Sequence, residues 1–266
     1  MLVVYSDLDG TLLDHETYSF DAARQALDRL QAHAVPLIFC TSKTRAETEI
    51  WRARLDNTHP FIVENGGALF IPQGYFPMNL QAPARRDGYE VFEFGDPYVE
   101  LVGALRAAAE ESSCQVRGFH DMTVEEVGES CGIPTDQARK AREREYDEPF
   151  EITAGESDRL LAAIERRGKR WTRGGRFYHV LGANDKGLCL GLLSRLYRQT
   201  FREVSTAGLG DSPNDAAFLR VVDIPVIIRS EASTGLQSLI PGVRVTDLPG
   251  PQGWNRAVLD ILRSPP

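Results

Sequence analysis

Short apolar runs alternate with amphipathic stretches over the first part of the chain. Residues 2–6, 35–40 and 61–64 are runs of four to six mostly apolar residues, which predict buried strands. Between them, residues 19–33 and 44–55 place apolar side chains at helical spacing, which predicts two amphipathic helices. Strands that alternate with helices in this way favour a parallel sheet covered by helices on both faces.

The pattern changes in the middle of the chain and then resumes. We expect α+β structure there, with strands at 89–94, 150–153 and 176–181 and helices at 98–111 and 135–145. The later elements are a helix at 186–197, a strand at 204–209, a helix at 214–221, a strand at 224–228 and a helix at 254–262. We therefore predict an α/β fold: a doubly wound, parallel-sheet, Rossmann-like core of residues 1–82 and 183–266, with an inserted α+β cap domain of residues 83–182.

Composition excludes several classes of protein. The chain has 266 residues, of which 42% are hydrophobic, enough for a substantial core. Its net charge of -8 and pI of about 5.3 argue against nucleic-acid binding. No apolar run reaches the ~20 residues of a membrane span, and the start lacks the basic segment of a signal peptide. The four cysteines are scattered without a metal or redox pair, as expected for reduced thiols in a cytoplasmic protein.

Two carboxylates follow the first strand directly. Asp7 and Asp9 alternate with Leu8, so their side chains leave the strand in roughly the same direction, just before Gly10 and Thr11. Like charges held this close repel, and a shared cation or a proton on one of them relieves the repulsion. Ligands of open α/β sheets bind at this end of the strands. An acidic turn before a helix is the alternative interpretation.

Polar residues gather at further strand ends. Residues 41–45 (Thr-Ser-Lys-Thr-Arg) offer hydroxyls, helix-start amides and two cations to a phosphate-like anion, although a helix cap accounts for the same residues. Lys186 precedes the helix that resumes the core and suits a transferring phosphoryl group, unless it is simply solvated. Asp211 and Asp215 follow the next strand, and carboxylate oxygens suit magnesium. A capped helix start accounts for the Ser-Pro between them.

Taken in this order on an alternating α/β chain, these patterns resemble the four motifs of the haloacid dehalogenase superfamily, whose members are aspartate-nucleophile phosphohydrolases. The resemblance covers the whole chain. About a hundred residues lie between the third strand and Lys186, which matches the subfamily with a large α+β cap. The run Glu64-Asn65-Gly66-Gly67 is a further mark of that branch.

The resemblance implies a role for each matching residue. Asp7 is the nucleophile that forms an aspartyl-phosphate, and Asp9 protonates the leaving oxygen and then deprotonates the hydrolytic water. Thr41 and Lys186 hold the phosphoryl oxygens. Asp215 orients Lys186 or a metal-bound water.

The implied cofactor is Mg²⁺, which shields charge between nucleophile and phosphate. Its implied ligands are Asp7, Asp9 through the backbone carbonyl, and Asp211. The acid at Asp9 also separates this chain from dehalogenases and phosphonatases, which lack it. Phosphomutases keep this acid but usually carry a different, earlier cap.

Charge in the predicted cap bears on the substrate. Residues 139–176 contain eleven Lys or Arg and eight Asp or Glu, a net +3 in a chain of net charge -8. A basic cap suits a substrate with a second anionic group besides the phosphate. Arg176 suits a carboxylate bound in bidentate fashion, and Asp147, Glu148 and His179 suit sugar hydroxyls. A salt-bridged helix face and a hairpin with a Gly-Gly turn are the alternative interpretation.

Residues 141–149 and 171–179, together with 41–45 and 64–67, are similar to the mannosyl-3-phosphoglycerate phosphatase family. That family converts 2-O-mannosyl-3-phosphoglycerate to mannosylglycerate, a compatible solute, so the implied partner is a phosphorylated glycoside of glycerate rather than nucleic acid or membrane. The residues alone indicate only a phosphate ester with a carboxylate and hydroxyls. The candidate substrate-binding residues are Ser42, Lys43, Arg45, Glu64, Asn65, Gly66, Arg144, Glu148, Thr172, Gly174, Gly175, Arg176 and His179.

Other functions stay open at this point. Glucosyl-3-phosphoglycerate is the nearest competing substrate, because one inverted hydroxyl separates the two sugars. A general sugar phosphatase comes next, and a phosphomutase has little support. A non-catalytic sensor of a phosphorylated metabolite belongs to another class, and a nucleophile at Asp7 argues against it.

Overall fold

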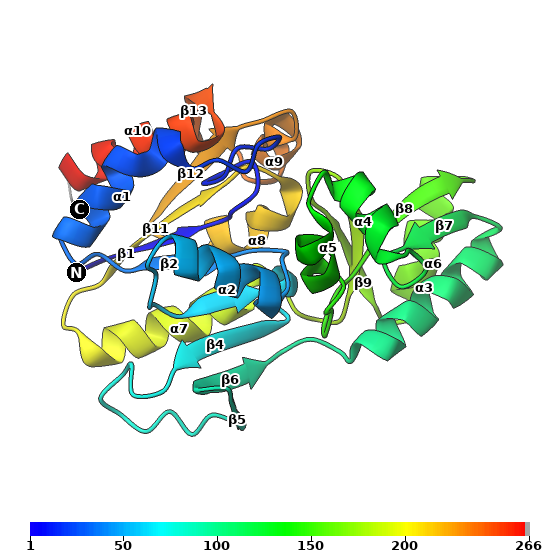
Figure 1. Cartoon of the computed structure of the whole chain (residues 1–266), viewed down its shortest axis with the longest axis horizontal. Helices are drawn as coiled ribbons and strands as arrows, with labels where there is room; N and C mark the ends of the chain where they lie inside the picture. The colour runs from blue at the N-terminus through cyan, green and yellow to red at the C-terminus, as the bar shows by residue number, and fades with distance from the viewer. Residues whose placement is uncertain (264–266) are drawn as a thin grey trace.

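Two β-sheets organise the molecule (Figure 1). The computed structural model describes residues 1–263. The larger sheet has nine strands in the order β13-β12-β11-β1-β2-β3-β4-β6-β5, and the smaller has four in the order β7-β8-β10-β9. The large sheet contains β1 (Leu2–Ser6), β2 (Leu37–Cys40), β3 (Phe61–Val63), β4 (Ala68–Pro72), β5 (Ala84–Arg86), β6 (Tyr89–Glu93), β11 (Ser205–Gly210), β12 (Ile224–Arg229) and β13 (Arg244–Pro249).

Helices cover both faces of the large sheet. Apolar side chains of α1, α2 and α10 pack on one face, and those of α7, α8 and α9 pack on the other. On β1, Val4 faces the first layer while Val3 and Tyr5 face the second, which is why this strand is apolar throughout. The helices are α1 (Arg24–Ala32), α2 (Arg45–Arg54), α7 (Lys186–Thr200), α8 (Ala216–Leu219), α9 (Ser233–Leu239) and α10 (Gly250–Arg263), with short 3-10 turns η1 (Asp21–Ala23), η2 (Glu64–Gly66) and η3 (Pro213–Asp215).

The predicted fold class is confirmed. The strands β13, β12, β11, β1, β2 and β3 are parallel to one another, as expected for a doubly wound core. The parallel order places the ends of β1, β2 and β11 side by side at one edge of the sheet. The candidate residues that follow those strands therefore meet there.

The smaller sheet and its helices form the cap, which lies against that edge (Figure 1). Apolar side chains of α3 and α6 pack on the sheet, while those of α4 and α5 form a separate cluster with Phe119 and Phe177. The cap contains α3 (Tyr98–Ser112), β7 (Gln115–Gly118), α4 (Val124–Cys131), α5 (Thr135–Ala141), β8 (Glu148–Ala154), α6 (Ser157–Arg166), β9 (Arg170–Arg173) and β10 (Tyr178–Leu181).

One boundary differs from the sequence prediction. The strand expected at 89–94, which we placed in a cap that began at residue 83, belongs to the large sheet as β6. The reason is β4, which follows β3 through a tight turn and offers its other edge to β6, so that β5 and β6 extend the core antiparallel. The predicted helix at 135–145 also ends earlier, at Ala141, where the chain turns toward the core.

No helix among residues 1–263 is long and apolar enough to cross a bilayer.

Trp254 links the helical layer to the edge of the sheet at which β1 ends, and its replacement tests this packing. The indole is fully buried and donates from Nε1 to Ser6 Oγ at 2.9 Å, and Ser6 in turn donates to the Asp7 carbonyl at 2.6 Å. We expect Trp254→Phe to lower the free energy of unfolding by about 1–3 kcal/mol, because it removes a buried donor and leaves a void. Urea denaturation measures this. Trp171→Phe, at a partly buried cap tryptophan, serves as the control, and an equal loss in both variants would contradict the assignment.

Candidate functional site

Asp7 stands at the floor of the site, where β1 ends. Its backbone N–H donates to the Leu209 carbonyl of β11, so the sheet itself fixes the residue's position. Lys186, the first residue of α7, places its Nζ atom 2.8 Å from Asp7 Oδ1 and 2.6 Å from Asp215 Oδ1. All three side chains are almost completely buried. One ammonium therefore bridges two carboxylates that lie far apart in the sequence.

The turn after β11 brings Asp211 into the same cluster. Asp215 Oδ2 accepts the backbone N–H groups of Asp211 and Ser212, at 2.9 and 3.1 Å. Thr11, from the loop after β1, donates its hydroxyl to Asp211 Oδ1 at 3.0 Å. Carboxylate oxygens of Asp7, Asp211 and Asp215 lie within 4.8 Å of one another. This is a spacing that a metal ion can bridge.

Crowding and burial perturb these carboxylates strongly. Burial, with smaller contributions from Asp215 and Asp9, raises the pKa of Asp7 to about 7 against the opposing effect of Lys186. Burial and the neighbouring carboxylates of Asp215 and Asp7 raise the pKa of Asp211 well above its usual range. Burial opposes the charge of Lys186, but its two carboxylate partners raise its pKa above the usual value. The cluster therefore carries more negative charge than one lysine balances.

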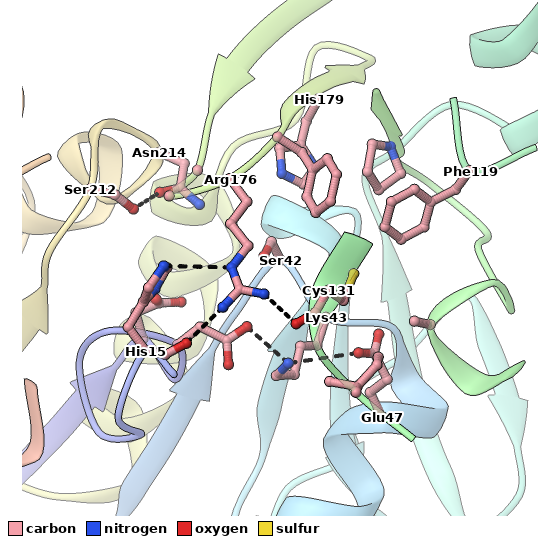
Figure 2. A pocket seen from close by; sticks show the side chains of 18 of the residues that line it. His15, Ser42, Lys43, Glu47, Phe119, Cys131, Arg176, His179, Ser212 and Asn214 are labelled. Carbon is pink, nitrogen blue, oxygen red and sulfur yellow. Dashed lines mark hydrogen bonds and ion pairs between the residues drawn. The ribbon is translucent and has the colours of Figure 1, made fainter. Parts of the chain in front are cut away.

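Asp9 lies apart from this cluster and faces a different cation. Its Oδ2 atom is 2.8 Å from Lys43 Nζ, and Lys43 also lies 3.7 Å from Glu47 Oε1 (Figure 2). The ammonium sits over the ring of Tyr18, 5.1 Å from its centroid. The second oxygen of Asp9, Oδ1, is buried and has no hydrogen-bond partner among the described residues. Asp9 therefore has one carboxylate oxygen held by Lys43 and one without a partner among the described residues.

Core and cap together enclose a pocket over these residues. Ser42, Lys43 and Glu47 line it from the core, whereas Phe119, Arg176 and His179 line it from the cap (Figure 2). Its lining residues are Asp7, Asp9, His15, Tyr18, Ser42, Lys43, Glu47, Phe119, Cys131, Ile133, Ala141, Arg144, Pro149, Gly174, Gly175, Arg176, Phe177, His179, Asp211, Ser212 and Asn214. Acid, base and apolar groups therefore converge on one enclosed volume.

Arg176 crosses the pocket from cap to core. Its guanidinium donates to the carbonyl of His15 at 2.8 Å and to the carbonyl of Cys131 (Figure 2). The sequence predicts that this side chain binds a substrate carboxylate in bidentate fashion. In the structure the donors needed for that contact are engaged by main-chain oxygens, because the hairpin between β9 and β10 reaches the loop after β1. Arg176 therefore ties the cap to the core in this state.

A second set of polar contacts joins the domains at the back of the pocket. Asp147 is fully buried and accepts from His179 Nδ1 at 2.8 Å and from Asn65 Nδ2 at 2.6 Å. Arg144 lies 3.3 Å from the same carboxylate and also donates to the Ser42 carbonyl at 2.8 Å. Burial alone would raise the pKa of Asp147, but His179, Arg144 and Asn65 outweigh it and lower that pKa. The carboxylate therefore stays ionised in the interior.

Comparisons with known proteins give the same assignment as the residues. Residues 4–76 match the family described as haloacid dehalogenase-like hydrolase. A glucosyl-3-phosphoglycerate/mannosyl-3-phosphoglycerate phosphatase of Methanococcoides burtonii is 42% identical over 263 residues, covering 98% of this chain and 97% of its own. The chain belongs to the haloacid dehalogenase superfamily, in its mannosyl-3-phosphoglycerate phosphatase family. It is therefore a phosphatase.

A second relative and a solved structure agree with this placement. A mannosyl-3-phosphoglycerate phosphatase of Pyrococcus furiosus is 35% identical over 85% of this chain and 90% of its own. The solved structure of a subclass IIB sugar phosphatase of the superfamily, BT4131, covers 99% of this chain and 98% of its own, with a TM-score of 0.66 at 18% identity. The structural likeness supports the fold, and the two sequence relatives support the family.

The structure of this phosphatase places most of the sequence-predicted residues around the pocket or directly beneath it. The predicted residues that line the pocket are Asp7, Asp9, Ser42, Lys43, Arg144, Gly174, Gly175, Arg176, His179 and Asp211. Lys186 and Asp215 lie directly beneath Asp7. Thr41 is buried at the end of β2, where its hydroxyl accepts the N–H of Lys43 at 3.2 Å.

Six of the predicted substrate-binding residues do not line the pocket. Arg45 pairs with Asp87 on the outer side of α2, since it begins the helix on its solvent face. Glu64 accepts the backbone N–H groups of Glu145 and Tyr146, so it binds the cap rather than the pocket. Thr172 lies on β9 but not in the pocket lining.

Gly66 and Glu148 also contact other parts of the protein rather than the pocket. Gly66 has a φ of +84°, and a Cβ there would stand 2.1 Å from the Asp185 carbonyl, so glycine is required for close packing. Glu148 accepts from the Tyr98 hydroxyl at 2.6 Å and from the His120 N–H at 3.1 Å, both within the cap. Asn65 likewise does not line the pocket, but its contacts reach residues that do.

Several pocket residues were missed from sequence. His15 and Tyr18 lie in the loop after β1, and no motif or periodicity distinguishes them. Ser212 and Asn214 lie inside the Asp211–Asp215 turn, where a helix-cap interpretation concealed them. The signal that was available is Asn214 itself, an amide placed one residue before a buried carboxylate.

Glu148 gives a pH-dependent test of its structural position. Burial raises the pKa of Glu148 to about 7, although Tyr98 and the His120 amide oppose this. Because the pKa of Glu148 in the folded protein is raised above the usual 4.5, its protonated carboxyl favours the folded state. This contribution to stability is complete below pH 4.5 and is lost as the pH rises through 7. We expect Glu148→Gln to be more stable than the parent protein by about 2–3 kcal/mol at pH 8 and by little at pH 5. Urea denaturation at both pH values measures this, with Glu151→Gln on the same strand as the control. The assignment would be contradicted if the difference in stability between Glu148→Gln and the parent protein were the same at both pH values.

Proposed function

We propose that this chain is a Mg²⁺-dependent phosphatase that hydrolyses 2-O-mannosyl-3-phosphoglycerate, and also its glucosyl counterpart, through an aspartyl-phosphate. The products are phosphate and the glycosylglycerate, a compatible solute. The observation that carries this proposal is the 42% identity, over 98% of the chain, to a relative named for both esters. The glucosyl activity is a second candidate because that name includes it.

The contacts of Asp7 support its role as nucleophile. Its carboxylate lies at the pocket floor and is held by Lys186, so one oxygen is directed toward an incoming phosphorus atom. Attack forms the phosphorus–Asp7 bond and breaks the bond to the alcohol oxygen of the substrate. Lys186 and the Thr41 hydroxyl, at the ends of neighbouring elements, are the groups we assign to the phosphoryl oxygens.

Asp9 is the group we assign to proton transfer. Its Oδ1 has no hydrogen-bond partner among the described residues, and Lys43 holds the other oxygen at 2.8 Å. In the first step Asp9 gives a proton to the departing alkoxide, and in the second it takes one from the water that cleaves the Asp7–phosphorus bond. Closure by Arg176 and the cap keeps other water from the intermediate.

The buried acidic cluster fits a divalent cation. Asp7, Asp211, Asp215 and Lys186 carry a formal charge of −2 when ionised, and burial makes that charge costly. A Cβ at Gly10 would lie 2.8 Å from Asp211 Oδ2, so glycine leaves room at that oxygen. Asp7 and Asp211, with the backbone carbonyl of Asp9, are the residues we assign to Mg²⁺. When bound, Mg²⁺ supplies shielding between the nucleophile and the phosphate. Asp215 already accepts three hydrogen bonds and acts as an orienting group.

The rest of the pocket suits the glycerate and the sugar. Lys43 is a buried cation beside Asp9 and is the carboxylate-binding group that the geometry favours over Arg176. His179, Ser212 and Asn214 offer donors and acceptors to sugar hydroxyls. Phe119 provides an apolar surface for a ring face. A substrate with phosphate, carboxylate and hydroxyls engages all of these groups.

A substrate panel tests this proposal. Phosphate release would be measured with mannosyl-3-phosphoglycerate, glucosyl-3-phosphoglycerate, 3-phosphoglycerate and hexose phosphates, before and after chelation and with Mg²⁺ restored. We expect kcat/KM for both glycosyl esters to exceed the other values by about tenfold or more, because only they fill the cap. Chelation should abolish turnover and Mg²⁺ should restore it. Activity on hexose phosphates alone would reject the substrate assignment while leaving the phosphatase chemistry intact.

Replacement of the nucleophile is a separate test. We expect Asp7→Asn to lower phosphate release from the best substrate by at least about a thousandfold, because an amide does not form the acyl-phosphate. Asp28→Asn, at an exposed position of α1, should leave the rate unchanged. Phosphate release close to that of the parent protein would exclude Asp7 as the nucleophile.

A further inference from the structure

A turn with unusual backbone geometry lies between core and cap. Glu64 and Asn65 have φ values of +45° and +54°, and Gly66 follows with +84°. Two consecutive non-glycine residues in the left-handed region are strained, and such strain persists only where surrounding contacts enforce it. Both side chains are buried, at 0% and 2% exposure. The contacts that hold this turn therefore identify what it does.

Both residues of the turn bind the same segment of the cap. The Glu64 carboxylate accepts the N–H groups of Glu145 and Tyr146, at 3.0 and 2.8 Å. Asn65 donates to the side chain of Asp147 at 2.6 Å. Three successive cap residues are thus bound by two successive core residues. These contacts exist only when the cap lies against the core.

Asn65 also contacts the turn that carries the catalytic carboxylates. Its Oδ1 atom accepts from Asn214 Nδ2 at 2.9 Å, and Asn214 Oδ1 accepts the Ser212 hydroxyl at 2.7 Å. The Asn65 carbonyl accepts from Asn184 Nδ2 at 3.3 Å, two residues before Lys186. One buried amide therefore reaches the cap, the Asp211–Asp215 turn and the start of α7.

The direction of these hydrogen bonds is fixed by Asp147. An ionised carboxylate only accepts, so the nitrogen of Asn65 must face it and the oxygen must face Asn214. Asn214 then donates to Asn65 and accepts from Ser212. When the cap moves away from the core, Asn65 loses the partner that sets its orientation. The direction of the hydrogen bonds that link Asn65, Asn214 and Ser212 is then no longer fixed.

We propose that Asn65 is a positioning residue that couples closure of the cap to the alignment of the Asp211–Asp215 turn. The coupling continues from Asn214 to Asp215, and from Asp215 through Lys186 to Asp7. Substrates that hold the cap closed thereby obtain the aligned turn, whereas small phosphate esters do not. This inference rests on the proposed substrate, and it adds the residue that reports cap closure to the core.

Replacement of Asn65 by aspartate tests the coupling. Asn65→Asp keeps a residue that tolerates the left-handed region and still accepts from Asn214, but it sets a second carboxylate against Asp147. We expect kcat for mannosyl-3-phosphoglycerate to fall by about tenfold or more, while kcat for p-nitrophenyl phosphate, which is too small to span the cap, changes by less than about threefold. Asn79→Asp, an exposed replacement of equal charge, should change neither.

The double variant supplies the decisive comparison. In Asn65→Asp combined with Asp147→Asn, the donor and acceptor are exchanged and one hydrogen bond between the domains is restored. We expect its kcat for the mannosyl ester to exceed, by about tenfold, the value obtained by combining the two single effects. Additive effects, or an equal loss on both substrates for Asn65→Asp, would overturn the proposal.

Two further measurements distinguish failure of the coupling from failure of the proposed substrate. If Asn65→Asp does not fold, Asp147→Asn removes the carboxylate that sets the direction of the Asn65 hydrogen bonds, and the same selective loss for the mannosyl ester is expected. An equal loss on both substrates would again overturn the coupling. If the parent protein hydrolyses p-nitrophenyl phosphate but neither glycosyl ester, the proposed substrate fails. The coupling is then tested with the best glycosyl phosphate found, with the same criteria.

Discussion

The buried contact of Lys186 with Asp7 and Asp215 is the constraint on which the rest of the site depends. Two carboxylates at 2.8 and 2.6 Å from one ammonium are stable in the interior only while all three remain together. The sheet provides this, because β1 and β11 are adjacent and α7 begins at the same edge. Asp211 then adds a charge that the lysine does not balance. The excess negative charge of these residues therefore favours a cation beside the carboxylates.

The sequence was sufficient for the core of the site because the relevant residues follow strands. A parallel sheet brings the carboxyl ends of its strands to one edge, so the sequence alone predicts that Asp7, Thr41 and Asp211 lie close together. The strand–helix alternation also predicted the doubly wound architecture, since each strand there is apolar on both faces. In both cases a regular pattern in the chain maps directly onto a regular feature of the fold.

The cap resisted the same reasoning. Its strands are short and polar on one face, so β7 and β9 give weak patterns. The residues of β5 and β6 are assigned to the cap from sequence, although these strands extend the sheet of the core. The role of Arg176 also depends on where the β9–β10 hairpin lands, which no local pattern contains. Glu148 is expected to bind substrate because carboxylates suit hydroxyls, and Glu64 because its run resembles the family, yet their partners are the protein's own N–H and O–H groups. Long-range packing, rather than residue type, decides such assignments.

The Glu64–Asn65 turn shows how the two levels connect. In sequence it marks the end of β3 and a family resemblance, and its residues suggested ligand contacts. In the structure this turn has a strained backbone and binds three consecutive cap residues. Through Asn65 it also binds the turn that carries Asp211 and Asp215. Glu64 and Asn65 are buried polar residues that neither line the pocket nor belong to the apolar layers. Their burial therefore needs another explanation. Coupling between the domains accounts for the strain, the burial and the direction of every hydrogen bond in the network with a single requirement, that the catalytic turn be aligned when the cap is closed.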